Sequence, residues 1–410
     1  MGNTMLSSVV PVFRRDMSVG AYMLFAQKEN HFMRPHLLGT GRYDGAGNIT
    51  GIEVLNNLTF SALNDDAVVF VPVNNISIFA EISAQYTMDR KRLVLLVDNT
   101  VKPEPTYLNR ILKLKEDGFK IALNNIHLTK LQQYKPVLKA IDYLFLKYES
   151  ADPEIQSMIC NKIEPGMTLG MLDIPTALEF DETSKSQGFE LFEGPFYRVP
   201  VHKDDTQINP LKVNYLKLMK YINTPDFDLD KVADIISRDA ALTMELLNVV
   251  NKLTVNSNIA SIKQATALLG QKELTKWLNT SLIKNLCADK PNEITRVSLI
   301  RAKFAESLSK SFNIAMRADE LFLLGLFSVL DYVLDRSMEE ALEEVSVAKD
   351  IHTALVKHRG PLAELYDFML EYEQGNWPEV SRIMVLRDID MDDVYDAYVE
   401  AHKWYKKVFS

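Results

Sequence analysis

The first half of the chain alternates short apolar runs with amphipathic stretches, and this alternation constrains the fold more than any other feature of the sequence. The apolar runs lack a polar face, which is typical of strands in parallel sheets that are covered on both sides. The amphipathic stretches at residues 106–117 and 177–187 predict surface helices. This order of strands and helices favours a barrel or a doubly wound parallel sheet. The predicted strands are residues 68–73, 92–97, 119–123, 143–147 and 167–172.

The second half of the chain, from about Leu211, has apolar residues at helical spacing almost throughout. ADIISRDAALTMELLNVVNKL and VSLIRAKFAESLSKSF are examples of this pattern. We place the boundary in the polar stretch HKDDTQINP, which predicts an α/β domain over residues 1–204 and an all-helical domain over residues 205–410. All three tryptophans fall in the predicted helical domain, at Trp277, Trp377 and Trp404.

The composition is that of an ordinary soluble protein, with 47% apolar residues, 25% charged residues and a net charge of −9. A net negative charge argues against broad contacts with nucleic-acid phosphates. The two cysteines, Cys160 and Cys287, are far apart in the sequence, which argues against a cysteine-rich zinc site. The N-terminus lacks the pattern of a signal peptide, and no apolar run reaches the roughly 18 residues of a membrane span. We therefore expect a cytoplasmic protein with neither a membrane nor a nucleic-acid partner.

The stretch GFKIALNNI, residues 118–126, predicts a buried strand that ends on two amides, Asn124 and Asn125. In α/β barrels, catalytic groups are placed where a strand passes into a loop. Magnesium and manganese need hard, usually anionic oxygen ligands, so two neutral amides are poor ligands for them. Asn is common in turns because its side chain satisfies loop backbone groups. We therefore interpret both residues as turn residues.

Seven segments of the first half follow the order, and nearly the spacing, of the signature segments of EAL domains. They are VVPVF, VGAYMLFA, VFVPVN, VLLVDN, GFKIALNNI, IDYLFLK and GFELFEGPFYRVP. The first half therefore resembles an EAL domain, a TIM-like barrel that hydrolyses the bacterial second messenger cyclic di-GMP with divalent metals. The resemblance implies the same barrel here, with a site at the carboxyl ends of its strands.

The same resemblance implies that the metal ligands of the family are missing. The two metal-binding aspartates correspond to Asn124 and Asn125, and the name-giving glutamate corresponds to Tyr22. The asparagine of the next strand corresponds to Pro72, and the glutamate after it to Leu96. One replaced ligand is tolerable, but a pair of divalent ions needs several carboxylates to offset its charge. We therefore expect a degenerate barrel that binds no metal.

The remaining functional positions of the family also differ. The lysine that helps to activate water corresponds to Phe145, and the aspartate two residues later corresponds to Lys147. The late glutamates would lie near Asp173, out of register, and the last glutamine corresponds to Glu193. The arginine that follows the EAL motif falls on Ala26.

Four segments of the second half resemble the HDOD domain, an all-helical relative of the HD hydrolases. They are SRDAALTMELLNVVN, IASIKQATALLGQKELTKWLN, DELFLLGLFSVLD and LAELYDFMLEYEQGNW. HD hydrolases bind metal through an adjacent His-Asp pair, since imidazole and carboxylate are natural ligands for such metals. That pair corresponds to Ser328 and Val329, and the chain contains no His-Asp dipeptide.

The whole chain thus resembles the two-domain bacterial EAL/HDOD signalling proteins, with a degenerate EAL domain. The resemblance implies a non-catalytic signal-transduction or scaffold protein without cofactors, which binds signalling proteins mainly through its HDOD half. We expect residues 206–410 to fold alone and to retain this binding. The alternative is a receptor that binds cyclic di-GMP or another nucleotide without hydrolysing it, which needs arginines and aromatics. Ala26 argues against cyclic di-GMP binding, and the sequence leaves the partner and a homo-oligomer open.

Overall fold

The chain forms two compact units. Unit 1 contains residues 1–199, 310–314 and 367–410, and unit 2 contains residues 200–309 and 315–366. These units differ from the predicted domains 1–204 and 205–410, because residues 367–410 pack with the first half of the chain. The computed structural model describes residues 5–27, 49–58, 67–86, 90–124, 132–148, 166–185, 188–200, 210–253 and 259–409.

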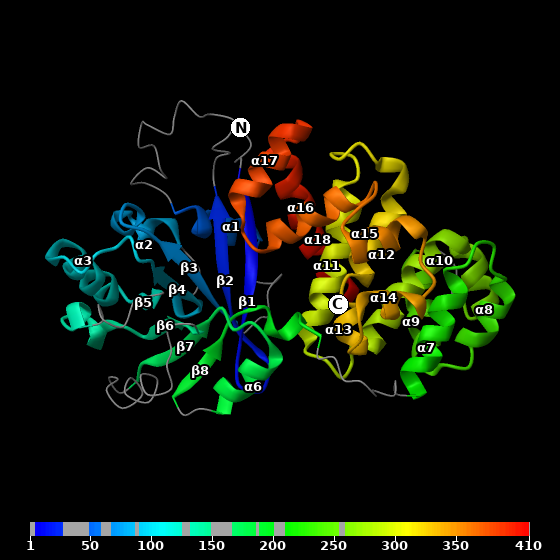
Figure 1. The fold of residues 1–410 in the computed structure, drawn as a ribbon, viewed down its shortest axis with the longest axis horizontal. Helices are drawn as coiled ribbons and strands as arrows, with labels where there is room; N and C mark the ends of the chain where they lie inside the picture. Colours follow the sequence, from blue (N-terminus) through cyan, green and yellow to red (C-terminus); the bar gives the residue numbers. More distant parts are fainter. Residues whose placement is uncertain are drawn as a thin grey trace. The chain divides into compact units, whose positions relative to one another are not determined.

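Unit 1 is built on a closed barrel in which the strands follow one another in sequence order from β1 to β8 (Figure 1). β1 is antiparallel to both of its neighbours, β2 and β8, and the other neighbouring strands are parallel. The strands are β1 (Leu6–Phe13), β2 (Val19–Gln27), β3 (Val68–Val73), β4 (Leu93–Val97), β5 (Lys120–Asn124), β6 (Tyr143–Lys147), β7 (Thr168–Leu172) and β8 (Phe189–Phe192).

Local sequence pattern explains most of this arrangement. β3 and β6 have the predicted bounds, and the predicted helix at 106–117 is α3 (Pro105–Glu116). α3 begins with a proline, which is favourable in the first turn because no partner is needed for its missing N–H. The other α-helices described between the strands are α1 (Thr50–Leu58), α2 (Ile82–Gln85) and α6 (Ala177–Lys185). The predicted fold class, a barrel followed by a helical region, is confirmed.

The interior of the barrel is an apolar core contributed by all eight strands. A close approach of two strands shows how tightly it is filled, because a Cβ on Gly170 of β7 would lie 2.2 Å from the Phe145 ring of β6. Phe145 also packs edge-on against Phe70 of β3, with ring centroids 5.1 Å apart. The buried members of this core are Val12, Ala21, Met23, Phe70, Val94, Leu96, Ala122, Phe145, Leu172 and Leu191.

The secondary structure in the described part of unit 2 consists of helices without strands, which confirms the predicted all-helical region. Side chains cap the starts of several of its helices. For example, Asp228 accepts bonds from the backbone of α8, and Ser337 forms a capping box with Glu340 in α14. The helices are α7 (Pro210–Ile222), α8 (Leu229–Ile236), α9 (Ala240–Leu253), α10 (Ile262–Leu286), α11 (Asn292–Leu308), α12 (Ala318–Phe327), α13 (Leu330–Leu334), α14 (Met338–Glu343), α15 (Lys349–Lys357) and the start of α16 (Ala363–Glu373).

The last helices of the chain belong to unit 1 rather than to the predicted helical domain. They are the end of α16, α17 (Trp377–Arg387) and α18 (Met391–Phe409). Two of the three tryptophans, Trp377 and Trp404, therefore lie in the barrel unit. Among the described residues, no helix has the length and apolar character that a membrane span requires.

Candidate functional site

Four polar side chains lie at the carboxyl ends of parallel strands of the barrel. Asn124 ends β5, Lys147 ends β6, Asp173 directly follows β7, and Glu193 directly follows β8. Because the carboxyl ends of parallel strands meet at one rim of a barrel, these residues form the candidate site. Asn125 lies outside the described residues.

Below this rim, the positions that were predicted from the resemblance to correspond to a metal-binding glutamate and to the catalytic lysine are filled by the apolar core. Leu96 and Phe145 have no solvent exposure, and both belong to the interior cluster. Pro72 is partly buried and pairs with Leu96 in the register of β3 and β4. These three side chains offer no oxygen or nitrogen atom that could ligate a metal.

The assignment of the EAL glutamate to Tyr22 places it on the wrong side of β2. Ala21 and Met23 belong to the interior core, and successive side chains of a strand point to opposite faces, so Tyr22 points away from the interior. A shift of one residue would move the position to Ala21 or Met23. Neither is a carboxylate, so the corrected register still supplies no metal ligand.

The rim contains a salt bridge between two strand ends. Lys147 Nζ lies 2.9 Å from Asp173 Oδ2, and both side chains are about half exposed. β6 and β7 are neighbours over their whole length, with Lys147 paired to Leu172, so the residue after β7 is brought next to Lys147. The sequence showed Asp173 only as an acid out of register. The tertiary structure makes it the counterion of Lys147.

Glu193 lies beside this pair and is held by the backbone of the loop after β7. The Asp173 N–H donates to Glu193 Oε2 at 3.3 Å, and the Ile174 N–H donates to the Glu193 carbonyl at 3.0 Å. Gly194 makes this close approach possible, because a Cβ there would lie 2.3 Å from the carbonyl oxygen of Ile174. Burial raises the pKa of Glu193 to about 7, the Asp173 N–H lowers it, the Asp173 carboxylate raises it, and Arg198 and Lys147 lower it.

The raised pKa of Glu193 predicts that Glu193→Gln stabilises the protein at high pH. The carboxyl pKa is about 7 in the folded state against an ordinary value of 4.5, so the folded state binds more protons between these values. Stability therefore falls as pH rises through this window, by up to about 3 kcal/mol. Glutamine cannot ionise and keeps an oxygen for the Asp173 N–H. Urea unfolding at pH 8 should show a gain of about 2 to 3 kcal/mol, and unfolding at pH 4.5 almost none.

Glu190→Gln is the matched control, because Glu190 lies on the same strand and is exposed to solvent. We expect no comparable pH-dependent gain from it. Equal stability of Glu193→Gln and the unchanged protein at pH 8 would contradict the burial of an ionisable carboxyl at this rim.

The described residues of the rim do not fit a pair of divalent ions. Lys147 brings a positive charge to the position predicted for a metal-binding aspartate, and a nearby cation repels a metal ion. Asn124 contributes one amide oxygen, whose Oδ1 atom is buried and has no hydrogen-bond partner among the described residues. Within the described ranges, no group of three or more His, Cys, Asp or Glu side chains is arranged to hold a metal.

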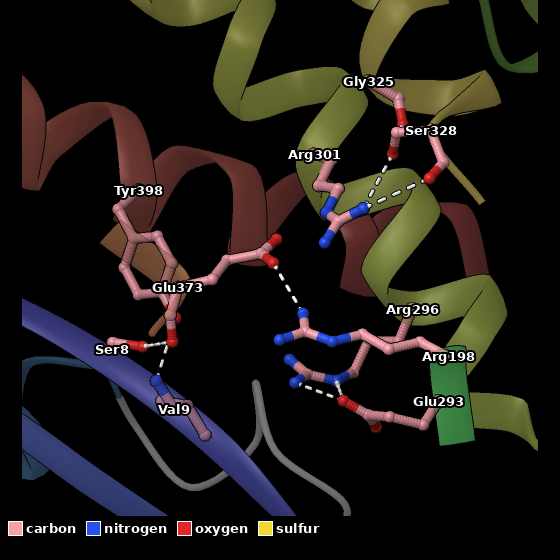
Figure 2. Close-up of polar contacts among 10 residues, drawn as sticks. All are labelled: Ser8, Val9, Arg198, Glu293, Arg296, Arg301, Gly325, Ser328, Glu373 and Tyr398. Atoms are coloured by element: carbon pink, nitrogen blue, oxygen red, sulfur yellow. Dashed lines mark hydrogen bonds and ion pairs between the residues drawn. The ribbon is translucent and has the colours of Figure 1, made fainter. Parts of the chain in front are cut away.

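The HD positions of unit 2 are buried and hydrogen-bonded within the fold. Ser328 follows α12, and its Oγ donates to the Gly325 carbonyl at 2.7 Å. Arg301 of α11 donates from Nη1 to Ser328 Oγ at 3.0 Å (Figure 2). Val329 is 3% exposed and Arg301 is 5% exposed. As at the barrel rim, a positively charged side chain, Arg301, lies beside a position that was predicted to correspond to a metal ligand of the family.

Sequence reasoning did not single out Arg301. The signal was an arginine on the apolar side of an amphipathic helix, in VSLIRAKFAESL, where a buried charge needs partners. α11 and α12 approach closely at this point, since a Cβ on Gly325 would lie 2.4 Å from the carbonyl oxygen of Arg301. This contact fixes Ser328 against α11.

Residues 208–357 match the HDOD domain family. The chain is 25% identical to the cyclic di-GMP phosphodiesterase CdgJ of Vibrio cholerae over 323 residues, which cover 78% of this chain and 74% of CdgJ. It is also 25% identical to YuxH of Bacillus subtilis over 409 residues, which cover 96% of each protein. The structure of Bacillus subtilis YkuI, an EAL-domain protein in complex with cyclic di-GMP and calcium, is similar with a TM-score of 0.35 and 17% identity, covering 66% of this chain and 72% of YkuI. A similarity of that size does not establish a shared structure.

These similarities confirm the predicted likeness to EAL/HDOD proteins, while the degeneracy of the first half stays a prediction. The HDOD match begins at residue 208, just after the barrel unit's first segment, and ends at residue 357, well before the C-terminus. Residues 208–357 therefore form an HDOD domain, which follows an eight-stranded barrel in a chain similar to CdgJ and YuxH.

Proposed function

We propose that this chain is a non-catalytic signalling protein that acts through contacts with other proteins, and that its barrel does not hydrolyse cyclic di-GMP. The observation that carries the proposal is the filling of the barrel interior. Leu96 and Phe145 are fully buried in one apolar cluster, at the positions where an EAL hydrolase has a metal ligand and its lysine. A divalent ion placed there would lose its hydration without gaining ligands, which is strongly unfavourable.

A second line of support is the charge at both predicted metal positions. In the barrel, Lys147 pairs with Asp173, and in the HDOD domain Arg301 donates to Ser328. The positive charge that a hydrolase takes from its metal is supplied by a side chain in each case. A lysine or arginine held in a salt bridge or hydrogen bond cannot activate water as a metal does, because it carries no bound water of lowered pKa.

Two rival functions have to be distinguished from this one. CdgJ is named as a cyclic di-GMP phosphodiesterase, which favours an active enzyme. The second rival is a receptor that binds the nucleotide without hydrolysing it. The receptor requires only that the rim of the barrel accepts the nucleotide. The enzyme requires a metal site in addition. A hydrolysis assay and a binding assay together distinguish the three functions.

We expect no hydrolysis of cyclic di-GMP by the full-length protein in the presence of manganese or magnesium. The reaction mixture is separated by chromatography and compared with a reaction without protein, with CdgJ assayed in parallel as the positive control. The physical reason is that Leu96, Phe145 and Lys147 cannot hold the metal pair. Turnover above the blank that disappears on addition of a chelator would overturn the non-catalytic function.

Titration calorimetry with cyclic di-GMP, with and without calcium, tests whether the protein is a receptor for this nucleotide. We expect no saturable heat, since the rim offers a lysine that is already paired and no described arginine at the family's position. Saturable binding of cyclic di-GMP without hydrolysis would contradict the proposed scaffold function and would support a receptor function instead.

A further inference from the structure

The first strand of the barrel has an edge that its neighbour β8 leaves largely uncovered. β1 pairs with β2 from Leu6 to Phe13, but its register with β8 contains the single pair Phe13–Phe192. We call this junction of β1 and β8 the seam. Ser7 and Val9 are two residues apart, so their N–H groups point to the same edge of β1. Buried backbone groups at such an edge need other partners.

Two tyrosines from the C-terminal helices supply those partners. The Ser7 N–H donates to the Tyr372 hydroxyl of α16 at 3.2 Å, and the Val9 N–H donates to the Tyr398 hydroxyl of α18 at 3.2 Å. Figure 2 shows the second of these bonds. Both tyrosines are buried, and their ring centroids are 5.1 Å apart. The two hydroxyls therefore take the place of the carbonyls of a neighbouring strand.

Glu373, the residue after Tyr372, connects both sides of the seam. Its carbonyl accepts from Ser8 Oγ at 2.8 Å, and its carboxylate lies 3.1 Å from Arg198 Nη1 (Figure 2). Ser8 belongs to β1, and Arg198 ends the short turn that follows β8. Both side chains of the ion pair are largely buried, with exposed fractions of 26% for Arg198 and 18% for Glu373. A partly buried charge pair of this kind is screened less by salt than a surface pair.

We propose that residues 367–410 form a clasp that holds the seam of the barrel closed. The clasp lies outside the HDOD match, which ends at residue 357, and packs in unit 1 with the barrel. Helix α16 is continuous from Ala363 to Glu373, while the border between the units falls between Tyr366 and Asp367. The first anchors of the clasp, Tyr372 and Glu373, therefore lie on the part of α16 that belongs to unit 1.

Hydrogen exchange of the full-length protein tests the clasp at single amides. Tyr398→Phe removes the acceptor of Val9 and leaves that of Ser7, whereas Tyr372→Phe does the reverse. We expect each variant to speed exchange of its own amide by about fivefold to tenfold, the effect of losing one hydrogen bond. The other amide serves as the internal control. Tyr366→Phe, on the same helix but in unit 2, should change neither.

Arg198→Met extends the test to the second anchor without altering a tyrosine. It should speed exchange at Ser7, Ser8 and Val9 together, while the amides of β4 (Leu93–Val97) keep their rates. Two results would overturn the clasp. One is unchanged exchange of Ser7 and Val9 in both tyrosine variants, and the other is an equal rise in β4, which would indicate general destabilisation instead of a local seam.

Discussion

Removal of residues 367–410 is expected to abolish cooperative folding of the barrel unit. This segment belongs to unit 1, and several of its side chains have no solvent exposure. Burying a large apolar side chain contributes about 1.5 to 3 kcal/mol to the free energy of unfolding. Several such side chains together exceed the net stability of a typical domain, which is about 5 to 15 kcal/mol. The fully buried residues of the segment are Phe368, Met369, Tyr372, Val380, Met384, Val394 and Ala401.

The test uses a chain that ends at Tyr366. Its thermal unfolding is monitored by circular dichroism, and its exposed apolar surface is measured by the binding of a fluorescent dye. We expect a strong loss of the barrel transition and increased dye binding. A chain that ends at Tyr405 is the control, since it removes only the last five residues, of which Lys406 and Lys407 are exposed and Val408 is partly buried. An unchanged transition in the chain that ends at Tyr366 would show that the barrel folds without its C-terminal segment.

Replacement of Phe145 is expected to have the second largest effect. Phe145 has no solvent exposure, packs edge-on against Phe70 and fills the space over Gly170. Phe145→Ala should lower the free energy of unfolding by about 3 to 5 kcal/mol, because it leaves a cavity in a closed barrel. Phe145→Lys, which restores the family's residue, should cost at least as much, because it buries an ammonium group in an apolar cluster. Urea unfolding of both variants measures the effect.

Phe79→Ala is the matched control for these variants. Phe79 is 40% exposed and has one ring neighbour, Tyr107, at 5.5 Å. Its replacement should lower the free energy of unfolding by about 1 kcal/mol or less. If Phe145→Lys folds as stably as the control, the interior is not the packed core described above. If this variant also hydrolyses cyclic di-GMP, the replacement of the lysine alone would explain the lack of activity.

The sequence determined the parts of the fold that depend on local pattern. β3 and β6 have the predicted bounds because each is a short apolar run between clear turn or helix signals. The absence of a His-Asp dipeptide is also a property of the sequence alone and does not depend on how the chain packs. The replacement of the EAL residues stays a prediction from the resemblance.

The face on which a β2 residue lies could not be predicted from the sequence. β2 is buried on both faces along much of its length, so its residues show no apolar-polar alternation that would fix the register. A shift of one residue therefore placed the EAL glutamate on Tyr22, although Ala21 and Met23 line the interior. In the same way, Lys147 and Asp173 are 26 positions apart and become partners only because β6 and β7 are adjacent.

The tertiary structure alone decided which unit holds the end of the chain. Helical periodicity in α17 and α18 shows that each helix buries one face, but it carries no information about the surface that covers that face. The boundary predicted at residues 204 and 205 therefore assigned Trp377 and Trp404 to the HDOD half, and it favoured residues 206–410 as a folding fragment. The structure favours residues 200–366 instead, because residues 367–410 bury their apolar face in the barrel unit and their tyrosines satisfy the edge of β1.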